Sequence, residues 1–331
     1  MIAKYNAKIT GTGHFVPEKI LTNADLEKMV DTSDEWIRTR TGMSVRHVAS
    51  KDEAASDLSY HAALKALEAA DLKPKDLDMI IVGTISGDHA FPSTACILQK
   101  KLGLRNFPAF DISAGCPGWI YAINIAKQFV ENGVAQNVLV IGVEILTKIT
   151  NYKDRNTCIL FGDGAGASII SRKEPTDISR IIDSEITADG THNELLIQEA
   201  GGSRMPACKE SVKKNLHTLY MEGNKIFKFA VKSMYSMCDI VLKRNNLDVT
   251  SIDWLITHQA NMRIIDALGR KMKIDTNKVI VNIEKYGNTS SATIPIALDE
   301  AIREGKIRKG DLVLMASFGA GLTSGSLLIR L

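Results

Sequence analysis

Short apolar runs alternate with longer amphipathic segments along most of the chain. The amphipathic periodicity predicts helices at 54–70 and 225–245 and two more that end near residues 132 and 304. The apolar runs predict buried strands at 79–84, 107–112, 138–142, 254–258, 279–283 and 312–316. Because such strands alternate with helices, the pattern predicts an α/β fold whose mostly parallel sheets are covered by helices on both faces.

The predicted elements occur twice in the same order. A helix, a linker and a strand at 54–84 return at 225–258, and a strand, a turn of small residues, a helix and a strand at 107–142 return at 279–316. The first match has an offset of 175 residues (254 − 79), and the turns are offset by 172 (288 − 116). Two matches at nearly one offset indicate a duplicated β/α unit. We expect an N-terminal half at 1–171 and a C-terminal half at 172–331.

Three residues whose side chains could take part in a reaction follow predicted strands. Cys116 lies at a break between a strand and a helix, where unpaired N–H groups and the helix dipole are expected to favour thiolate over thiol. Pro117 is expected at the first helical position. Taken alone, this run is equally typical of a tight connection. The duplication pairs Cys116 with Asn288, and His258 also ends a strand, so the fold could join a nucleophile to two polar partners between the halves.

Each of these residues also has a plain structural interpretation. His258 could be a hydrogen-bonded core histidine, although the adjacent Gln259 and Asn261 would be costly to bury unless they meet something polar. Asn288 alone could be a turn or cap residue.

The remaining cysteines and glycine clusters are expected to be structural. Cys96, Cys158, Cys208 and Cys238 are predicted to be small buried residues. The clusters at 11–13 and 162–166 lack the residues that complete a dinucleotide or phosphate loop, and they are expected to be tight turns. The glycine-rich run at 318–325 follows the strand opposite Cys116, so Ala320 is assigned a backbone oxyanion donor.

Composition excludes several classes of protein. The 331 residues are 45% hydrophobic and 24% charged, which suits a globular chain. With 41 Lys and Arg against 38 Asp and Glu, the net charge of +3 gives no reason to expect nucleic acid as a partner. The chain has no run long enough to span a membrane and no apolar signal segment, so a cytoplasmic protein is expected. Five cysteines without a Cys-x-x-Cys pair favour free thiols over disulfides or a zinc site.

Three runs together resemble a known family. Cys116 in its turn, His258-Gln259-Ala260-Asn261 and Tyr286-Gly287-Asn288-Thr289-Ser290 are similar to the motifs of β-ketoacyl-acyl-carrier-protein synthase III, of the thiolase superfamily. The likeness covers nearly the whole chain and includes the runs at 22–26, 33–42, 89–93, 161–166 and 318–321. It implies a duplicated five-layered α/β/α/β/α fold and a homodimer.

The resemblance also implies a reaction. Cys116 would take an acyl group from acyl-CoA, with acetyl-CoA expected, and malonyl-acyl-carrier protein would then lose carbon dioxide and attack the thioester. His258 and Asn288 would donate hydrogen bonds to the enolate, and the backbone N–H groups of Cys116 and Ala320 would hold the thioester oxygen. The product would be acetoacetyl-carrier protein, which starts a fatty acid. No metal or other cofactor is implied.

Binding residues are carried over in the same way. The resemblance places Trp36, Arg40 and Arg155 at the CoA adenine end, and Asn224 and Asn261 beside the pantetheine arm. Phe91 would close the acyl pocket across the dimer. Basic residues at 225, 228 and 232 and at 263, 270 and 271 could meet the acidic carrier protein, and Arg263 and Lys228 are the expected contacts, although a solvated helix face explains them equally well.

Some features depart from the family or favour other functions. Pro117, Trp119, Ala320 and Ser324 differ from the usual pattern, so the sequence leaves the length or branching of the starter acyl group open. The absence of glutamate between Glu68 and Glu131 disfavours 3-hydroxy-3-methylglutaryl-CoA synthase, and Asn288 disfavours thiolases and elongating synthases. A starter-loading or quinolone-type condensing enzyme of secondary metabolism and a non-catalytic carrier-binding protein are the alternatives.

Overall fold

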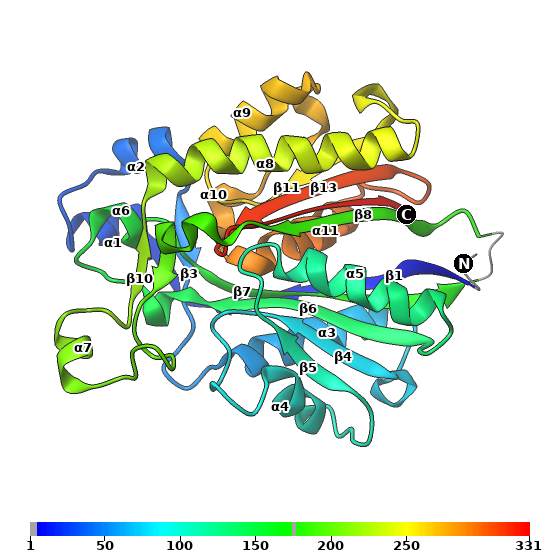
Figure 1. Cartoon of the computed structure of the whole chain (residues 1–331), viewed down its shortest axis with the longest axis horizontal. Coiled ribbons are helices and arrows are strands. Elements are labelled where there is room, and N and C mark those ends of the chain that lie inside the picture. Colours follow the sequence, from blue (N-terminus) through cyan, green and yellow to red (C-terminus); the bar gives the residue numbers. More distant parts are fainter. Residues whose placement is uncertain (1–4, 174–176) are drawn as a thin grey trace.

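The computed structural model describes residues 5–173 and 177–331, and two five-stranded sheets form its centre (Figure 1). The first sheet has the order β1 (Asn6–Phe15), β7 (Asp163–Lys173), β6 (Asn137–Ile145), β4 (Met79–Gly83) and β5 (Ala109–Ile112). The second has the order β8 (Arg180–Ala188), β14 (Thr323–Arg330), β13 (Leu312–Gly319), β11 (Trp254–Thr257) and β12 (Val279–Ile280).

The two sheets match position by position. In each sheet the fourth strand is parallel to both of its neighbours, whereas the second strand pairs antiparallel on both sides. Four strands of each sheet therefore run in one direction, but only two of the four pairings in each sheet are parallel, so the prediction of mostly parallel sheets is only partly right. The repeated order confirms the duplicated α/β architecture. The division at residue 171 stays a prediction, and β7 itself continues to Lys173.

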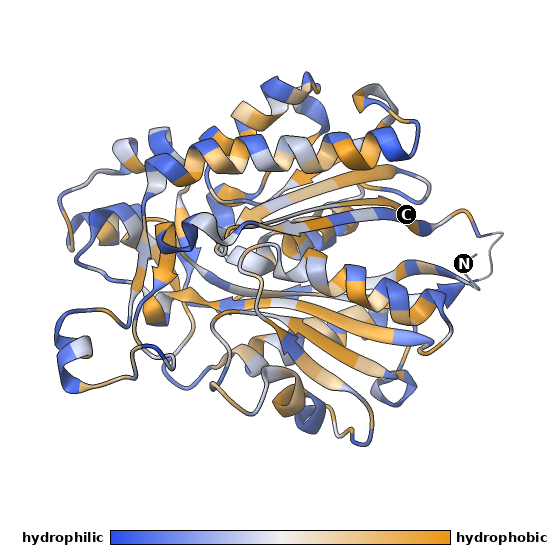
Figure 2. Cartoon of the chain, in the orientation of Figure 1, coloured by the Kyte–Doolittle hydropathy of each residue, from blue (hydrophilic) through white to orange (hydrophobic). Residues whose placement is uncertain are grey.

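Helices form the other three layers. Between the sheets lie α5 (Gly118–Glu131) and α11 (Thr293–Arg303), and α5 contacts strands of both sheets. The outer face of the first sheet is covered by α3 (Ala55–Ala69) and α4 (Thr94–Lys101), and α8 (Gly223–Arg244) packs on the second sheet with α9 (Met262–Met272) beside it. Figure 2 shows apolar strands and mixed outer helices, as burial of one helix face requires.

Smaller elements lie mainly at one end of the sheets. The short strands are β2 (Ile20–Thr22), β3 (Val45–His47), β9 (Leu196–Gln198) and β10 (Leu219–Met221). The short helices are α1 (Asn23–Glu27), α2 (Asp34–Thr41), α6 (Arg155–Cys158), α7 (Lys209–Lys213) and α10 (Ile283–Tyr286). The short 3-10 helices are η1 (Pro74–Asp76), η2 (Leu146–Ile149), η3 (Gly190–Leu195), η4 (Val249–Ser251), η5 (Thr276–Lys278) and η6 (Ser290–Ala292). Within the described ranges, no helix combines the length and the apolar character needed to cross a bilayer.

Two sequence predictions of local structure are wrong. The strand predicted at 279–283 stops at Ile280, because α10 begins at Ile283. Neither glycine cluster is a tight turn: the first lies inside β1, and the second, from Asp163 onward, forms the start of β7. A Cβ on Gly11 would lie 2.2 Å from the carbonyl oxygen of Ala66, so glycine lets α3 pack directly on the strand.

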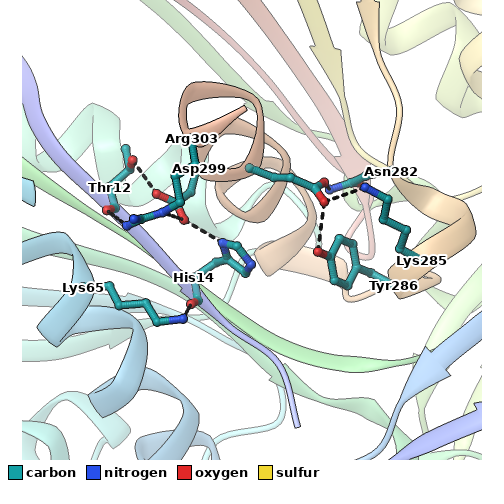
Figure 3. A network of polar contacts seen from close by, with 9 residues as sticks. Thr12, His14, Lys65, Asn282, Lys285, Tyr286, Asp299 and Arg303 are labelled. Atoms are coloured by element: carbon teal, nitrogen blue, oxygen red, sulfur yellow. Dashed lines mark hydrogen bonds and ion pairs between the residues drawn. The ribbon is translucent and has the colours of Figure 1, made fainter. Parts of the chain in front are cut away.

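A polar network ties the middle layer to the first sheet (Figure 3). Asp299 of α11 accepts a hydrogen bond from Thr12 Oγ1 at 2.7 Å and contacts His14 Nδ1 at 2.6 Å, both on β1. Arg303 Nε donates to the same carboxylate at 2.8 Å, and its terminal nitrogen donates to the Thr12 carbonyl oxygen. The buried carboxylate is therefore satisfied, and α11, which follows the predicted Asn288 turn, is held against the half that carries Cys116.

Candidate active site

Cys116 lies in the loop between β5 and α5. Gly115 adopts φ +57°, and a Cβ there would lie 2.9 Å from the backbone nitrogen of Ala320, so glycine lets the two loops touch. Pro117 is the N-cap residue and α5 begins at Gly118, so proline lies one position earlier than predicted. The residue as a whole is half-buried, and the loop of the opposite half lies against its sulfur.

The expected thiolate character of Cys116 is wrong, because burial favours the thiol. Desolvation raises the pKa of the thiol to about 12, with a further increase from the nearby charge of Glu144, and it outweighs the hydrogen bond from Ser290. The helix start does not overcome burial here. Burial therefore favours the protonated thiol of Cys116 at neutral pH, and that proton would have to leave before the sulfur could act as a nucleophile.

His258 follows β11, and its side chain is buried. The Nδ1 atom lies 2.7 Å from Thr293 Oγ1, at the start of α11. Burial lowers the pKa of the imidazole to about 3, so the ring is neutral at physiological pH. The Thr293 hydroxyl has one proton, which can go either to Nδ1 or to the Ser290 carbonyl oxygen 2.9 Å away. When it goes to Nδ1, the tautomer carries its proton on Nε2, and that edge becomes a hydrogen-bond donor.

Asn288 follows α10 in a buried turn. Its Oδ1 atom accepts a hydrogen bond from the backbone nitrogen of Ser290 at 2.8 Å. Because the amide oxygen is used within the turn, the NH2 group is the end that can donate to a ligand. Gly142 of β6 permits this placement, because a Cβ there would lie 2.3 Å from the carbonyl oxygen of Ser291.

All three predicted residues converge on Ser290. Its Oγ atom lies 3.4 Å from Cys116 Sγ, and its backbone nitrogen bonds to Asn288. Its carbonyl oxygen lies 2.9 Å from Thr293 Oγ1, and Thr293 contacts His258. One residue of the C-terminal half thus links the thiol of the N-terminal half to the imidazole and the amide.

The predicted oxyanion donor lies beside the thiol. A Cβ on Gly319 would lie 2.6 Å from the backbone nitrogen of Cys116 and 3.0 Å from Sγ, so the end of β13 packs directly on the cysteine. Ala320 follows, and its backbone nitrogen faces Gly115. The loop that carries Ala320 therefore adjoins the cysteine, and the donor roles of the two N–H groups stay a prediction.

The residues assigned to the CoA adenine end also come together. The guanidinium of Arg155 lies 4.8 Å from the Trp36 ring centroid, and that of Arg40 lies 5.2 Å from it. Trp36 and Arg40 belong to α2, whereas Arg155 begins α6. An indole flanked by two guanidinium groups offers a stacking surface with positive charge, which suits a nucleotide.

The other assigned binding residues lie at or near the surface of the chain. Asn224 is exposed in the first turn of α8, and Asn261 caps α9 by accepting a hydrogen bond from the Arg263 nitrogen at 2.9 Å. Phe91 is 86% exposed in the single chain. Lys228 is exposed on α8. The guanidinium of Arg263 lies 5.8 Å from the ring of Phe227, which precedes Lys228 in the chain. The roles of these residues stay predictions.

Two of the four cysteines expected to be buried are exposed. Cys158 and Cys238 are buried, as predicted. Cys96 is exposed in the first turn of α4, and Cys208 is exposed as the N-cap residue of α7, where its sulfur accepts a hydrogen bond from the Ser211 nitrogen. Both positions are at helix starts on the surface, which a lone cysteine in the sequence does not reveal.

Three polar residues of the site were not singled out from the sequence. Ser290 and Thr293 link the predicted residues, and Glu144 is fully buried in β6 with Ser290 as a partner at 3.2 Å. A single carboxylate inside an otherwise apolar strand was the available signal for Glu144. Within residues 5–173 and 177–331, no group of three or more His, Cys, Asp or Glu side chains is arranged to hold a metal ion.

The chain is similar to proteins of one family over its whole length. Residues 110–190 match the family model described as 3-oxoacyl-[acyl-carrier-protein (ACP)] synthase III, and residues 242–331 match the model of its C-terminal part. The beta-ketoacyl-[acyl-carrier-protein] synthase III of Caldanaerobacter subterraneus subsp. tengcongensis is 58% identical over 330 residues, which cover 100% of this chain and 99% of the relative.

Solved structures agree with this similarity. The 3-oxoacyl-[acyl-carrier-protein] synthase III from Aquifex aeolicus VF5 superposes with a TM-score of 0.90 at 47% identity and covers 98% of this chain and 100% of its own. The priming beta-ketosynthase of the R1128 polyketide pathway has a TM-score of 0.91 at 30% identity, covering 100% of this chain and 98% of its own. The chain therefore belongs to the 3-oxoacyl-[acyl-carrier-protein] synthase III family of condensing acyltransferases.

Proposed function

We propose that this enzyme condenses acetyl-CoA with malonyl-acyl-carrier protein, with loss of carbon dioxide, to give acetoacetyl-carrier protein and so initiate fatty acid biosynthesis. The observation that carries the proposal is the convergence of Cys116, His258 and Asn288 on Ser290 at the seam between the halves. A nucleophile beside two neutral donors suits acyl transfer followed by attack of an enolate.

Acyl transfer to the enzyme is the first step. Cys116 Sγ forms a bond to the thioester carbonyl carbon, the bond from that carbon to the CoA sulfur breaks, and CoA leaves as its thiol once it has gained a proton. Charge develops on the carbonyl oxygen during the attack. The backbone N–H groups of Cys116 and Ala320 are the donors proposed to stabilise it.

Condensation is the second step. The bond between the malonyl carboxylate and the α-carbon breaks, carbon dioxide leaves, and the electron pair becomes an enolate. In the His258 tautomer in which Thr293 donates to Nδ1, Nε2–H of His258 and the NH2 group of Asn288 donate to the enolate oxygen. A neutral imidazole donates without taking up the charge, in keeping with the low pKa of buried His258. The α-carbon then attacks the acyl thioester and releases Cys116.

The substrate arms are proposed to enter past the rim. Trp36 with Arg40 and Arg155 would bind the CoA nucleotide, and Asn224 and Asn261 would flank the pantetheine. The position of both guanidinium groups over the Trp36 ring supports this assignment. No cofactor besides the CoA thioester substrate is proposed.

A homodimer in the cytoplasm is proposed as the working form. Phe91 carries a large apolar side chain that is 86% exposed, and β5 lies at the edge of its sheet. An exposed aromatic side chain and an open strand edge are both features that suit an interface between two copies. Phe91 would then close the acyl pocket of the partner.

Arg263 is proposed to bind the acidic carrier protein together with Lys228. Exchange of Arg263 for glutamate is expected to raise the KM for malonyl-carrier protein about tenfold at low salt while acyl exchange with acetyl-CoA is unchanged, because a rim charge steers the macromolecular partner. Both rates are measured in parallel. Lys75→Glu, an exposed reversal on η1, is the control. Equal loss of both activities would contradict a docking role.

A starter-loading enzyme of another pathway is the second candidate. The similarity to a priming beta-ketosynthase of a polyketide pathway favours it, because the two chains share the fold at 30% identity. Trp119 and Ser324 differ from the usual pattern of the family, and such differences could change which starter acyl group the enzyme accepts. Trp119 is buried in the core between the layers, and Ser324 is buried on β14.

Competition between acyl donors tests the two candidates. The enzyme is given malonyl-carrier protein with acetyl-CoA, longer straight-chain, branched or aromatic acyl-CoA, and the carrier-bound products are identified by mass spectrometry. We expect acetoacetyl-carrier protein as the main product. Condensation with longer or aromatic donors alone would favour the second candidate, and no condensation with any donor would overturn the proposed activity.

A further inference from the structure

Glu144 is a buried carboxyl group that the steps described above do not use. It lies in β6 with no exposed surface, within a strand whose other residues are also buried. Its Oε2 atom accepts hydrogen bonds from Ser86 Oγ, from Thr84 Oγ1 at 3.3 Å and from the Ile85 nitrogen at 3.2 Å. These donors come from the loop after β4 and hold one carboxylate oxygen in place.

The other oxygen points toward the nucleophile. Glu144 Oε1 lies 3.2 Å from Ser290 Oγ, which in turn lies 3.4 Å from Cys116 Sγ. The Ser290 hydroxyl has one proton and can accept one more, so it can donate to either neighbour while it accepts from the other. Ser290 has φ +49°, in the left-handed region, which holds its side chain between the two groups.

Glu144 and Cys116 are the two groups here between which a proton, and with it the negative charge, could move. Burial raises the pKa of Glu144 to about 7, against the opposing hydrogen bonds from Ser86, Ile85, Ser290 and Ser291. The groups that face Glu144 from the β4 loop and from η6 are neutral donors, and Cys116 is the titratable group across from it. The carboxyl group is thus able to hold or release a proton under working conditions.

We propose that Glu144 and Ser290 form a proton relay for Cys116, in which the carboxylate takes the thiol proton through the serine hydroxyl and returns it later. During acyl transfer the S–H bond breaks, Ser290 accepts that proton, and the Ser290 proton passes to Glu144. The negative charge moves from carboxylate to sulfur as Sγ attacks. CoA leaves as a thiolate and takes a proton from solvent.

The proton stays on Glu144 while Cys116 carries the acyl group. When the enolate attacks the thioester, Cys116 leaves as a thiolate. Glu144 then passes its proton through Ser290 back to sulfur, and the resting thiol is restored. Ser290 contacts the reacting sulfur, whereas Glu144 acts through Ser290.

Alkylation of Cys116 by iodoacetamide tests the relay. The rate is followed between pH 5.5 and 9.5 by intact mass, with peptide mapping of the modified residue. In the parent enzyme we expect the rate to rise with the ionisation of Glu144 near neutral pH and then to level off. In Glu144→Gln we expect this limb to disappear and the rate at pH 7 to fall about 100-fold, the size of a general base effect.

The sign of this change separates a relay from a fixed charge. The charge of Glu144 raises the pKa of Cys116, so removal of a merely electrostatic carboxylate would speed alkylation. Faster alkylation, or an unchanged pH profile, in Glu144→Gln would overturn the proposal. The relay also requires that Glu144→Gln add nothing to the defect of Ser290→Ala, because both remove one path. Additive losses would contradict it.

Two further variants keep the test independent of folding defects. Ser86→Ala removes a donor that lowers the pKa of Glu144, so the midpoint of the rate profile is expected to move to higher pH, and no movement would count against the relay. Asp163→Asn, a change at another buried carboxyl in the same half, is the matched control and is expected to keep the parental profile. Circular dichroism checks the fold of each variant.

The relay rests on the acyl-carrying role proposed for Cys116, and the two fail separately. Alkylation requires neither acyl-CoA nor carrier protein. A parental pH profile with a neutral limb, together with no acylation by any acyl-CoA, would overturn the proposed function and leave the relay standing. Acylation with no dependence on Glu144 would do the reverse.

Discussion

Exchange of Cys116 for alanine is expected to abolish acyl transfer and condensation. The neighbouring imidazole is buried with its Nδ1 against Thr293, and a serine hydroxyl such as that of Ser290 is a much weaker nucleophile than a cysteine sulfur, so neither is expected to replace Cys116 as acyl carrier. Loss of a covalent nucleophile costs roughly 10⁴-fold or more in rate. Condensation is measured with labelled malonyl-carrier protein and acetyl-CoA.

The same variant is expected to keep decarboxylation. Alanine leaves His258 and Asn288 in place, because their hydrogen bonds run to Thr293 and to the Ser290 backbone rather than to the thiol. Release of labelled carbon dioxide from malonyl-carrier protein should therefore continue without condensation. Condensation at the parental rate would mean that the acyl group is not carried on Cys116.

Removal of either enolate donor is expected to impair decarboxylation while acylation of Cys116 continues. In His258→Ala and Asn288→Ala, decarboxylation should fall by about 10²–10³, because one preorganised donor to the developing oxyanion is lost. Acylation of Cys116 by acetyl-CoA should continue, since neither side chain bonds to Sγ in the structure. Carbon dioxide release and acyl-enzyme formation are measured on the same preparations.

A neighbouring residue supplies the control for the donor variants. Thr289 adjoins Asn288, is buried, and its hydroxyl has no hydrogen-bond partner among the described residues. Thr289→Val removes that hydroxyl with little change in shape, so decarboxylation should stay near the parental rate. If Thr289→Val lost as much activity as Asn288→Ala, the loss would reflect general packing of the turn and not the amide donor.

The sequence predicted most of the architecture because its repeat is recorded in apolar periodicity. Strands such as β6 and β13 are apolar on both faces, and the offset between the halves follows from local patterns alone. The same offset paired Cys116 with Asn288, and the structure places both turns at Ser290. Features that depend on one strand or one helix could therefore be predicted from the sequence.

Features that depend on contacts between distant segments could not be predicted from the sequence. The glycines of β1 resemble a turn in sequence, and only the approach of α3 explains them. The thiol of Cys116 was expected to ionise at a helix start, but desolvation by surrounding segments raises its pKa. Glu144 lies 28 residues after Cys116 in the sequence, and only the pairing of β6 with β4 and the position of η6 bring it to Ser290.

The most direct test of the account is a single-turnover measurement of the acyl group on Cys116. Enzyme is mixed with one equivalent of labelled acetyl-CoA, and the label is located by peptide mass mapping before malonyl-carrier protein is added. The account predicts one acetyl group on Cys116 that disappears at the rate at which acetoacetyl-carrier protein forms. Product formation without a labelled Cys116, or a Cys116 label that malonyl-carrier protein leaves in place, would contradict it.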